Sequence, residues 1–285
     1  MKDVFEIAGG SVAGRDHVAA GRNNQDAFAW HQDDRCTIAV VCDGCSEGPH
    51  SEVGAQLGAW LLMRTVEDHF WEYATNSFDE TRREPADAPR FWEEVQEMFL
   101  LNFTAALIPP MTNIAVQSNR IVLDYFLFTV VGALLTERYA YVFSIGDGVI
   151  AVNGEIETLG PFPGNAPPYP AYAAMDSSAA MARRTAFRLR PPVPISGVQS
   201  LLLGTDGVKD LIAAADRKIH GRDESVGPLA QFWTDDRFFW NPDIARRRLT
   251  LINRESVRVE NGALMREPGL LRDDTTLVVI RRIPK

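Results

Sequence analysis

The sequence predicts a mixed α+β fold that forms one domain over residues 1–285. Short apolar runs rich in β-branched residues, such as residues 36–42, have the length and composition of buried strands. Longer segments, such as residues 90–107, repeat apolar side chains at steps of three and four, as helices do. With 46% hydrophobic and 24% charged residues, the chain can bury a substantial core.

The N-terminal half is predicted to contain a strand, a polar motif, a second strand and a helix. The strand at residues 36–42 stops at Asp43, which precedes a glycine, and residues 51–62 then have helical spacing. The polar residues 75–89 are expected to form a loop, and residues 90–107 a core helix.

The middle of the chain is predicted to form strands and then an irregular segment. Residues 126–135 and 139–145 are apolar and strand-like. Asp147 and the glycine after it stand between the second run and residues 149–152, which predicts a hairpin. Residues 162–194 are rich in Pro, Ala and Ser, which predicts a surface loop or flap.

The C-terminal part returns to regular elements. Residues 200–204 are a further predicted buried strand, which ends shortly before Asp206. Residues 241–253 are expected to form a helix, and residues 273–280 begin with two aspartates and continue as an apolar strand. We find neither an internal repeat nor a clear linker between domains.

Charge and cysteine content argue against several classes of protein. The net charge of −9 repels nucleic-acid backbones and anionic membranes, so we expect neither as a partner. The longest strongly apolar stretch, residues 126–135, is much shorter than the roughly 20 residues that span a membrane. Cys36, Cys42 and Cys45 are too few for a disulfide framework, so the cytoplasm is the expected location.

Aspartates gather at the predicted strand ends. Asp43, Asp147 and Asp206 each follow an apolar run and precede a glycine, Asp273 opens the last strand, and Asp26 lies just before another apolar segment. Such side chains can converge at one edge of a stack of sheets, where they repel one another unless cations lie between them. Asp-Gly is also the commonest turn dipeptide, so each pair has an alternative interpretation as a simple turn.

Oxygen-only ligand sets would select hard cations such as Mg²⁺ and Mn²⁺ at such an edge. Two ions of this kind can activate a water and orient a phosphoryl group for in-line attack. The aspartates therefore indicate hydrolysis of a phosphate ester without a covalent protein intermediate.

Several short motifs support this interpretation because of their order. They are Asn24-Gln25-Asp26-Ala27, Val40-Val41-Cys42-Asp43-Gly44, Phe128-Thr129, Ser144-Ile145-Gly146-Asp147, Leu203-Gly204-Thr205-Asp206-Gly207 and Asp273-Asp274-Thr275-Thr276. Together they resemble the PPM family (type 2C) of metal-dependent serine/threonine protein phosphatases. Gly14-Arg15-Asp16-His17 is similar to a stretch of a bacterial-type branch of that family.

The resemblance implies a four-layer α-β-β-α sandwich with a central pair of mainly antiparallel sheets. It also implies two, and with a weaker site three, Mn²⁺ or Mg²⁺ ions. The implied ligands, directly or through water, are Asp26, Asp43, Gly44, Asp147, Asp206 and Asp273. Among them, Asp43, Asp206 and Asp273 are the implied catalytic residues, with Asp147 at the weaker third site.

The chain departs from the family pattern at three places. Gln25 stands where many members have Glu, and Gly148 follows Asp147 where the family has Ser. The family's phosphate-binding Arg is out of register, so Arg22 is the expected phosphate ligand and His17 its competitor. These departures bear on metal affinity and substrate choice more than on the fold.

The implied function is hydrolysis of phosphoserine and phosphothreonine in proteins by a metal-activated water. The expected partner is a phosphorylated protein, together with a cognate Ser/Thr kinase. One alternative is a catalytically weak PPM-like regulator that binds phosphoproteins. The other is a redox protein, because Cys42 and Cys45 form a Cys-x-x-Cys motif between a strand and a helix.

Overall fold

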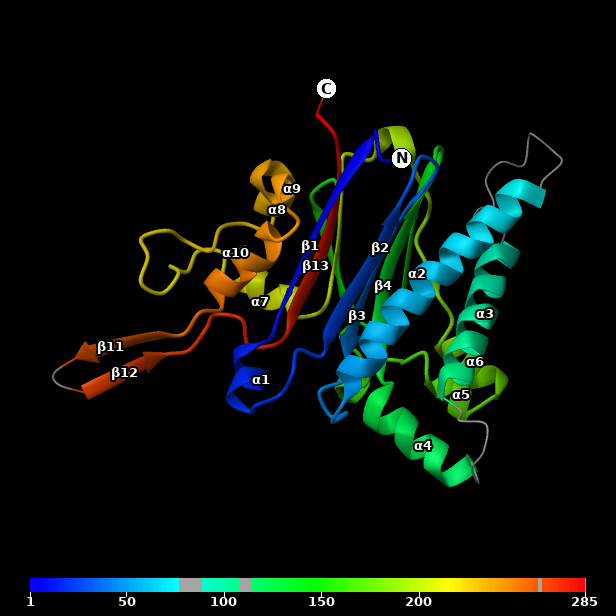
Figure 1. Ribbon diagram of the computed structural model, residues 1–285, viewed down its shortest axis with the longest axis horizontal. Coiled ribbons are helices and arrows are strands. Elements are labelled where there is room, and N and C mark those ends of the chain that lie inside the picture. The colour runs from blue at the N-terminus through cyan, green and yellow to red at the C-terminus, as the bar shows by residue number, and fades with distance from the viewer. Residues whose placement is uncertain (77–88, 108–113, 261–262, 285) are drawn as a thin grey trace.

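The computed structural model of the protein describes residues 1–76, 89–107, 114–260 and 263–284. Two β-sheets pack face to face in it, and helices cover the outer face of each sheet (Figure 1). Both chain termini lie at the same end of this sandwich (Figure 1). The predicted four-layer α-β-β-α architecture is therefore confirmed.

The first sheet has five strands in the order β1-β13-β10-β6-β7, all of them antiparallel to their neighbours. Its strands are β1 (Phe5–Val12), β6 (Gly148–Val152), β7 (Glu155–Leu159), β10 (Ser200–Gly204) and β13 (Thr275–Arg282). The helices near its outer face are α7 (Val208–Ala213), α8 (Gln231–Thr234), α9 (Arg237–Trp240) and α10 (Ile244–Ile252). Leu202 packs on the helix side and Leu203 between the sheets, which explains why this strand is apolar throughout.

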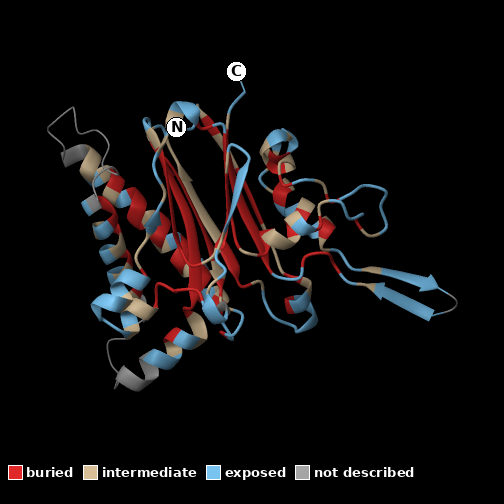
Figure 2. Cartoon of the chain, turned by 180° about the vertical axis from the view of Figure 1, so that it is seen from behind, coloured by how far each residue is buried: buried red, intermediate tan, exposed pale blue. Residues whose placement is uncertain are grey.

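The second sheet has the order β2-β3-β4-β5-β8, and β9 also pairs with β5. Its strands are β2 (Asp26–Gln32), β3 (Thr37–Gly44), β4 (Phe128–Leu135), β5 (Tyr139–Ile145), β8 (Arg188–Leu189) and β9 (Val193–Pro194). The helices on this side are α2 (Ser51–Asn76), α3 (Pro89–Leu107), α4 (Ile114–Tyr125), α5 (Tyr172–Met175) and α6 (Ala179–Arg184). Figure 2 shows the two sheets as the continuous buried centre of the molecule.

The predicted hairpin around Asp147 is wrong, because β5 and β6 belong to different sheets. The backbone at Gly146 and Gly148 has φ of 90° and 145°, values that side chains other than glycine rarely adopt. A Cβ on Gly148 would also lie 2.7 Å from a carbonyl oxygen of β10. Asp147 therefore sits where the chain crosses from one sheet to the other.

The segment 162–194 is more regular than predicted. It contains the 3₁₀ helix η3 (Pro163–Asn165), the helices α5 and α6, and the short strands β8 and β9. Many of its residues are exposed, but Tyr169 and Ala171 are buried in the core of the second sheet. Its role as a flap stays a prediction, as does the single-domain organisation. The loop predicted at residues 75–89 lies largely outside the described residues.

Several elements were not anticipated from the sequence, among them one helix, one hairpin and one 3₁₀ helix that do not line the site described below. Helix α4 falls in a stretch for which no element is predicted, and the hairpin of β11 (Ser256–Glu260) and β12 (Ala263–Glu267) extends away from the body with mostly exposed side chains (Figure 2). A further 3₁₀ helix, η4 (Ile195–Gly197), precedes β10.

Candidate active site

Four aspartates from distant segments meet at the end of the sandwich where α1 (Arg15–Ala19) lies (Figure 1). Asp43 lies at the end of β3, Asp147 at the crossing from β5 to β6, Asp206 just after β10 and Asp273 just before β13. All four residues line one hollow. The structure thus brings together the carboxylates that the sequence places at strand ends.

The glycines after Asp43 and Asp206 allow close packing around these carboxylates. A Cβ on Gly44 would lie 2.5 Å from the Gln25 carbonyl oxygen. A Cβ on Gly207 would lie 1.9 Å from a carbonyl oxygen of the segment before β13. The two Asp-Gly pairs therefore do more than turn the chain, because their glycines let separate segments approach the hollow.

The carboxylates disturb one another's ionisation. Burial, together with the charges of Asp26, Asp206, Asp273 and Asp147, raises the pKa of Asp43 well above its ordinary value. Burial and the charge of Asp206 also raise the pKa of Asp147 and that of Asp273. A cation among carboxylates relieves such repulsion, and oxygen donors are what hard divalent cations require. The residues present therefore fit the metal ions that the resemblance implies.

Asp26 lies behind Asp43 in the protein interior. The two residues face each other across β2 and β3. Asp26 is buried, and its Oδ2 accepts a hydrogen bond from Thr205 Oγ1 at 2.8 Å. Burial and the charge of Asp274 raise the pKa of Asp26 well above its ordinary value. The carboxylate is thus held against Asp43 rather than presented on the wall of the hollow.

Asp274 was not among the predicted site residues, yet it joins the loops around the hollow. Its Oδ1 accepts from the Gly14 amide at 2.6 Å, and its Oδ2 accepts from the Gln25 amide at 2.5 Å. His17 Nδ1 lies 2.8 Å from Asp274 Oδ2, but without the alignment of a hydrogen bond. Within the described ranges, the buried side-chain atoms that lack a hydrogen-bond partner are His17 Nδ1 and Gln25 Oε1. Both belong to the segments that Asp274 joins, and His17 Nδ1 faces the Asp274 carboxylate.

A second hollow adjoins the first and shares Ser46 and two of the aspartates with it. His17, one of the two predicted phosphate ligands, lines this hollow. So do two cations that the sequence analysis missed, Lys209 and Arg272. Lys209 Nζ lies 2.9 Å from Asp206 Oδ2. Lys209 and Arg272 each stand within three positions of an acidic motif. A search for basic residues beside those motifs would therefore have found both of them.

Arg22, the other predicted phosphate ligand, is placed differently. Its side chain is exposed, and its Nη1 donates to the Ser46 carbonyl oxygen. It does not belong to the described residues that line the two hollows. Arg22 therefore supports the loop between them, whereas His17 faces the second hollow directly.

The Cys42–Cys45 motif lacks the properties of a redox centre. Cys42 is buried, and burial, followed by the charges of Asp26 and Asp43, raises the pKa of its thiol well above the ordinary value. A reactive dithiol needs a lowered thiol pKa and access to solvent. All three cysteines are free thiols. The site gives the redox alternative no support.

A four-layer sandwich with a carboxylate-lined hollow at one end is the arrangement that the resemblance to the PPM family implies. A family model, Protein phosphatase 2C, matches residues 13–240, which is most of the chain. The chain belongs to the protein phosphatase 2C family, whose members depend on metal ions. The predicted class, a protein serine/threonine phosphatase, is thereby confirmed.

Solved structures of this class share the fold. Serine-threonine phosphatase 2C from Toxoplasma gondii is 16% identical, with a TM-score of 0.57 over 98% of this chain and 95% of that one. A variant of a bacterial serine phosphatase is 15% identical, with a TM-score of 0.52 over 98% and 99%. Serine/threonine phosphatase Stp1 from Staphylococcus aureus is 14% identical, with a TM-score of 0.51 over 99% and 96%.

Two further comparisons give negative results. No curated protein matches the chain by sequence. Among the residues that the structure describes, no helix combines the length and the apolar character needed to cross a membrane.

Proposed function

We propose that the hollow lined by the four aspartates is where the chain hydrolyses phosphoserine and phosphothreonine esters. Water adds to phosphorus, the ester P–O bond breaks, and the products are inorganic phosphate and the free hydroxyl. One observation carries this assignment. Carboxylates from four segments far apart in the sequence meet at one hollow, although the charges of the other three raise the cost of ionising Asp43. Such an arrangement is expected where divalent cations bind.

Mn²⁺ and Mg²⁺ are the ions that this donor set suits best. Asp43, Asp206 and Asp273, with the Gly44 carbonyl, are the proposed ligands of two ions, and Asp147 is the proposed ligand of a third. Bound ions would supply Lewis-acid activation of water and neutralise the phosphoryl charge. Asp26 supports the site from behind, because its charge lies against Asp43.

Neighbouring residues hold these carboxylates in position. The contact with Lys209 orients Asp206. Asp210 Oδ2 accepts hydrogen bonds from the backbone amides of Arg272 and Asp273 at 2.7 and 3.2 Å. Fixing the ligands before the ions bind lowers the cost of assembling the site.

The second hollow is the proposed place for the outer oxygens of the phosphate. His17, Lys209 and Arg272 offer it hydrogen-bond donors, beside four carboxylates that also line it. A guanidinium can bind two phosphate oxygens in parallel, so Arg272 adds a candidate to the two that the sequence offers. Of those two, His17 is the one whose side chain faces this hollow, and Arg22 acts through Ser46.

The substrate is proposed to be a phosphorylated protein whose phosphate is supplied by a cognate Ser/Thr kinase. Tyr169 and Tyr172, from the segment 162–194, form part of the wall of the first hollow. A protein substrate would lie across this segment. Four of the five predicted acidic ligands line the hollow, and the fifth, Asp26, lies directly behind Asp43. This favours turnover over the alternative of a catalytically weak phosphoprotein-binding regulator.

A panel of phosphopeptides assayed with Mn²⁺ tests this function. We expect phosphate release from phosphoserine and phosphothreonine peptides, and much less from matched phosphotyrosine peptides. Asp223→Asn serves as a control because Asp223 is fully exposed. Binding of phosphopeptides without any release of phosphate would instead support the regulator alternative.

A further inference from the structure

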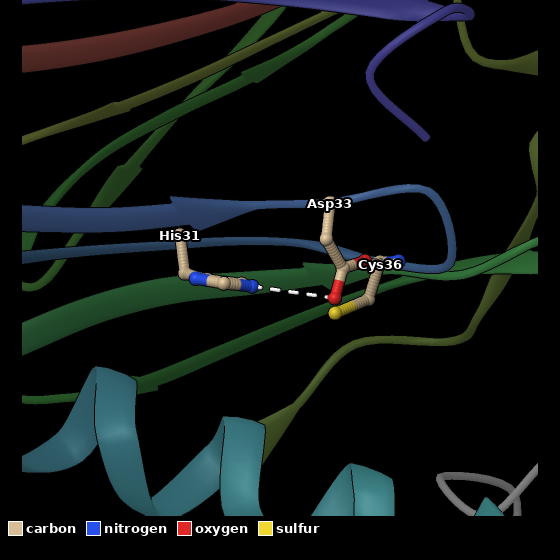
Figure 3. Close-up of side chains that lie close together, drawn as sticks. All are labelled: His31, Asp33 and Cys36. Carbon is tan, nitrogen blue, oxygen red and sulfur yellow. Dashed lines mark hydrogen bonds and ion pairs between the residues drawn. The ribbon is translucent and has the colours of Figure 1, made fainter.

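A second group of ligand-type side chains lies at the opposite end of the β2–β3 hairpin. His31, Asp33 and Cys36 offer one nitrogen, one oxygen and one sulfur, and these atoms all lie within 4.8 Å of one another (Figure 3). β2 runs from the catalytic end to this turn over seven residues. At about 3.3 Å per residue, the group is roughly 20 Å from the carboxylate hollow.

Helix α2 adds a fourth donor. Glu67 Oε1 lies 3.5 Å from His31 Nε2, and Asp33 Oδ2 lies 3.3 Å from the same nitrogen. The other oxygen of Glu67 is engaged by Arg64 at 2.7 Å, so Oε1 is the atom left to face the group. Two carboxylates and a thiol therefore surround one imidazole nitrogen.

Two of the donor separations fit a tetrahedral metal ion. Zinc binds nitrogen, oxygen and sulfur ligands at about 2.0–2.3 Å, which places neighbouring donors roughly 3.3–3.8 Å apart. The distances from His31 Nε2 to Asp33 Oδ2 and Glu67 Oε1, 3.3 and 3.5 Å, already lie in this range. Cys36 lies within 4.8 Å of His31 and Asp33, and Glu67 stands outside that group of three, so both side chains must move inward to complete the site. Cys36 is fully buried and Glu67 nearly so, whereas the side chains of His31 and Asp33 are 29% and 26% exposed. An ion could thus enter from solvent on the side of His31 and Asp33.

The backbone already orients one of the ligands. Asp33 Oδ1 accepts hydrogen bonds from the amides of Arg35 and Cys36, both at 2.7 Å. This leaves Oδ2 directed at His31 (Figure 3). Hydrogen bonds of this kind, from the protein to a ligand side chain, fix the ligands of structural metal sites.

We propose that His31, Asp33, Cys36 and Glu67 form a binding site for a borderline-soft divalent transition metal such as zinc. A thiol and an imidazole select this class of ion over Mg²⁺ and Mn²⁺. The four protein ligands leave no open position, which is the pattern of a structural site rather than a catalytic one. A bound ion joins the β2–β3 turn to α2 and stabilises the packing of that helix on the second sheet.

Cobalt binding to the full chain, with the thiols reduced, tests the site. We expect one Co²⁺ per chain to give the charge-transfer absorption of a thiolate ligand, and Zn²⁺ to displace it. The oxygen donors of the catalytic hollow cannot give this absorption, and Cys45, a thiol that lines it, is tested by its own variant, so the result does not depend on the proposed phosphatase function. Cys36→Ser should abolish the band, whereas Cys45→Ser, the matched thiol control near the hollow, should leave it unchanged.

Two variants keep the test decisive if Cys36→Ser does not fold. Loss of a residue that hydrogen-bonds to a metal ligand weakens metal binding roughly 10–100-fold. His31→Ala removes a ligand itself, so it should weaken zinc binding by more than that. Glu67→Gln should weaken it, whereas Asp68→Asn, which removes the adjacent exposed partner of Arg64, should not. Absence of the thiolate band, loss of the band in Cys45→Ser, or an unchanged zinc affinity in His31→Ala would each overturn the proposal.

Discussion

The two ends of the β2–β3 hairpin gather their ligand atoms in different ways. At the catalytic end, Asp43 meets aspartates that are more than a hundred residues away in the sequence, and all of them offer oxygen. At the turn, three donors come from six consecutive residues and offer nitrogen, oxygen and sulfur. Since oxygen donors select hard cations and thiolates select zinc-like ions, one hairpin is expected to bind different metals at its two ends.

The two groups of ligands also depend on different parts of the fold. The catalytic set depends on the correct packing of both sheets, because its members come from strands of each. The turn set depends on one hairpin and one contact with α2. Substitutions at one end should therefore leave metal binding at the other end intact.

The largest expected effect is that of Asp43→Asn. Asp43 lies centrally among the carboxylates, so its loss should disturb every ion at the hollow. We expect kcat to fall about 1,000-fold, which corresponds to about 4 kcal/mol of transition-state stabilisation. The thermal midpoint without metal should not fall, because the change removes a repelling buried charge. Wild-type kcat in this variant, measured beside Asp223→Asn, would show that the assignment is wrong.

Asp206→Asn and Asp273→Asn should come next in size. We expect Asp43 to contact both ions and each of these two residues to contact one, so kcat should fall on the order of 100-fold in each variant. Zinc affinity at the turn should stay at the wild-type value in both, measured by calorimetry. A parallel loss of zinc binding would break the proposed independence of the two ends.

Removal of a phosphate contact should have a smaller effect. His17→Ala should raise KM for p-nitrophenyl phosphate about 10-fold and weaken inhibition by inorganic phosphate, while the affinity for Mn²⁺ stays near wild type. Arg22→Ala should raise KM less, because Arg22 reaches the site through Ser46. Arg120→Ala, on an exposed arginine of α4, is the matched control. If Arg22→Ala has the larger effect, the original prediction of an Arg22 clamp holds instead.

The smallest expected effect lies in the segment 162–194. Arg184 is exposed, and its guanidinium lies 5.9 Å from the ring centre of Tyr172, which lines the first hollow. Arg184→Ala should raise KM about threefold for a phosphoprotein and leave KM for p-nitrophenyl phosphate unchanged, since the small substrate does not reach this surface. Arg247→Ala, on the exposed face of α10, should change neither value. Equal effects on both substrates would argue against a flap.

Much of the sandwich could be predicted because its strands are locally distinctive. The strands around Asp43 and Asp206 are apolar on both faces, so their length and composition suffice. The placement of β5 and β6 in different sheets could not be predicted, because an Asp-Gly pair between apolar runs has the same pattern in a hairpin and in a crossing between sheets. Only the backbone angles at Gly146 and Gly148 distinguish the two.

The site was partly predictable because some of its residues stand in distinctive local sequence patterns. Aspartates at strand ends are visible in the sequence, whereas Lys209 and Arg272 become site residues only when distant segments are brought together. The group at His31 was missed because its residues look like an ordinary strand and turn. Its fourth member, Glu67, comes from the middle of a helix. The cytoplasmic location stays a prediction.

Metal removal and return test the central claim most directly. The protein is freed of metal by exhaustive chelation and assayed with p-nitrophenyl phosphate before and after addition of Mn²⁺, Mg²⁺ or Zn²⁺. We predict no turnover in the metal-free protein, restoration by Mn²⁺ or Mg²⁺, and poor restoration by Zn²⁺, because the hollow offers carboxylate oxygens. Full activity after exhaustive chelation would contradict the account.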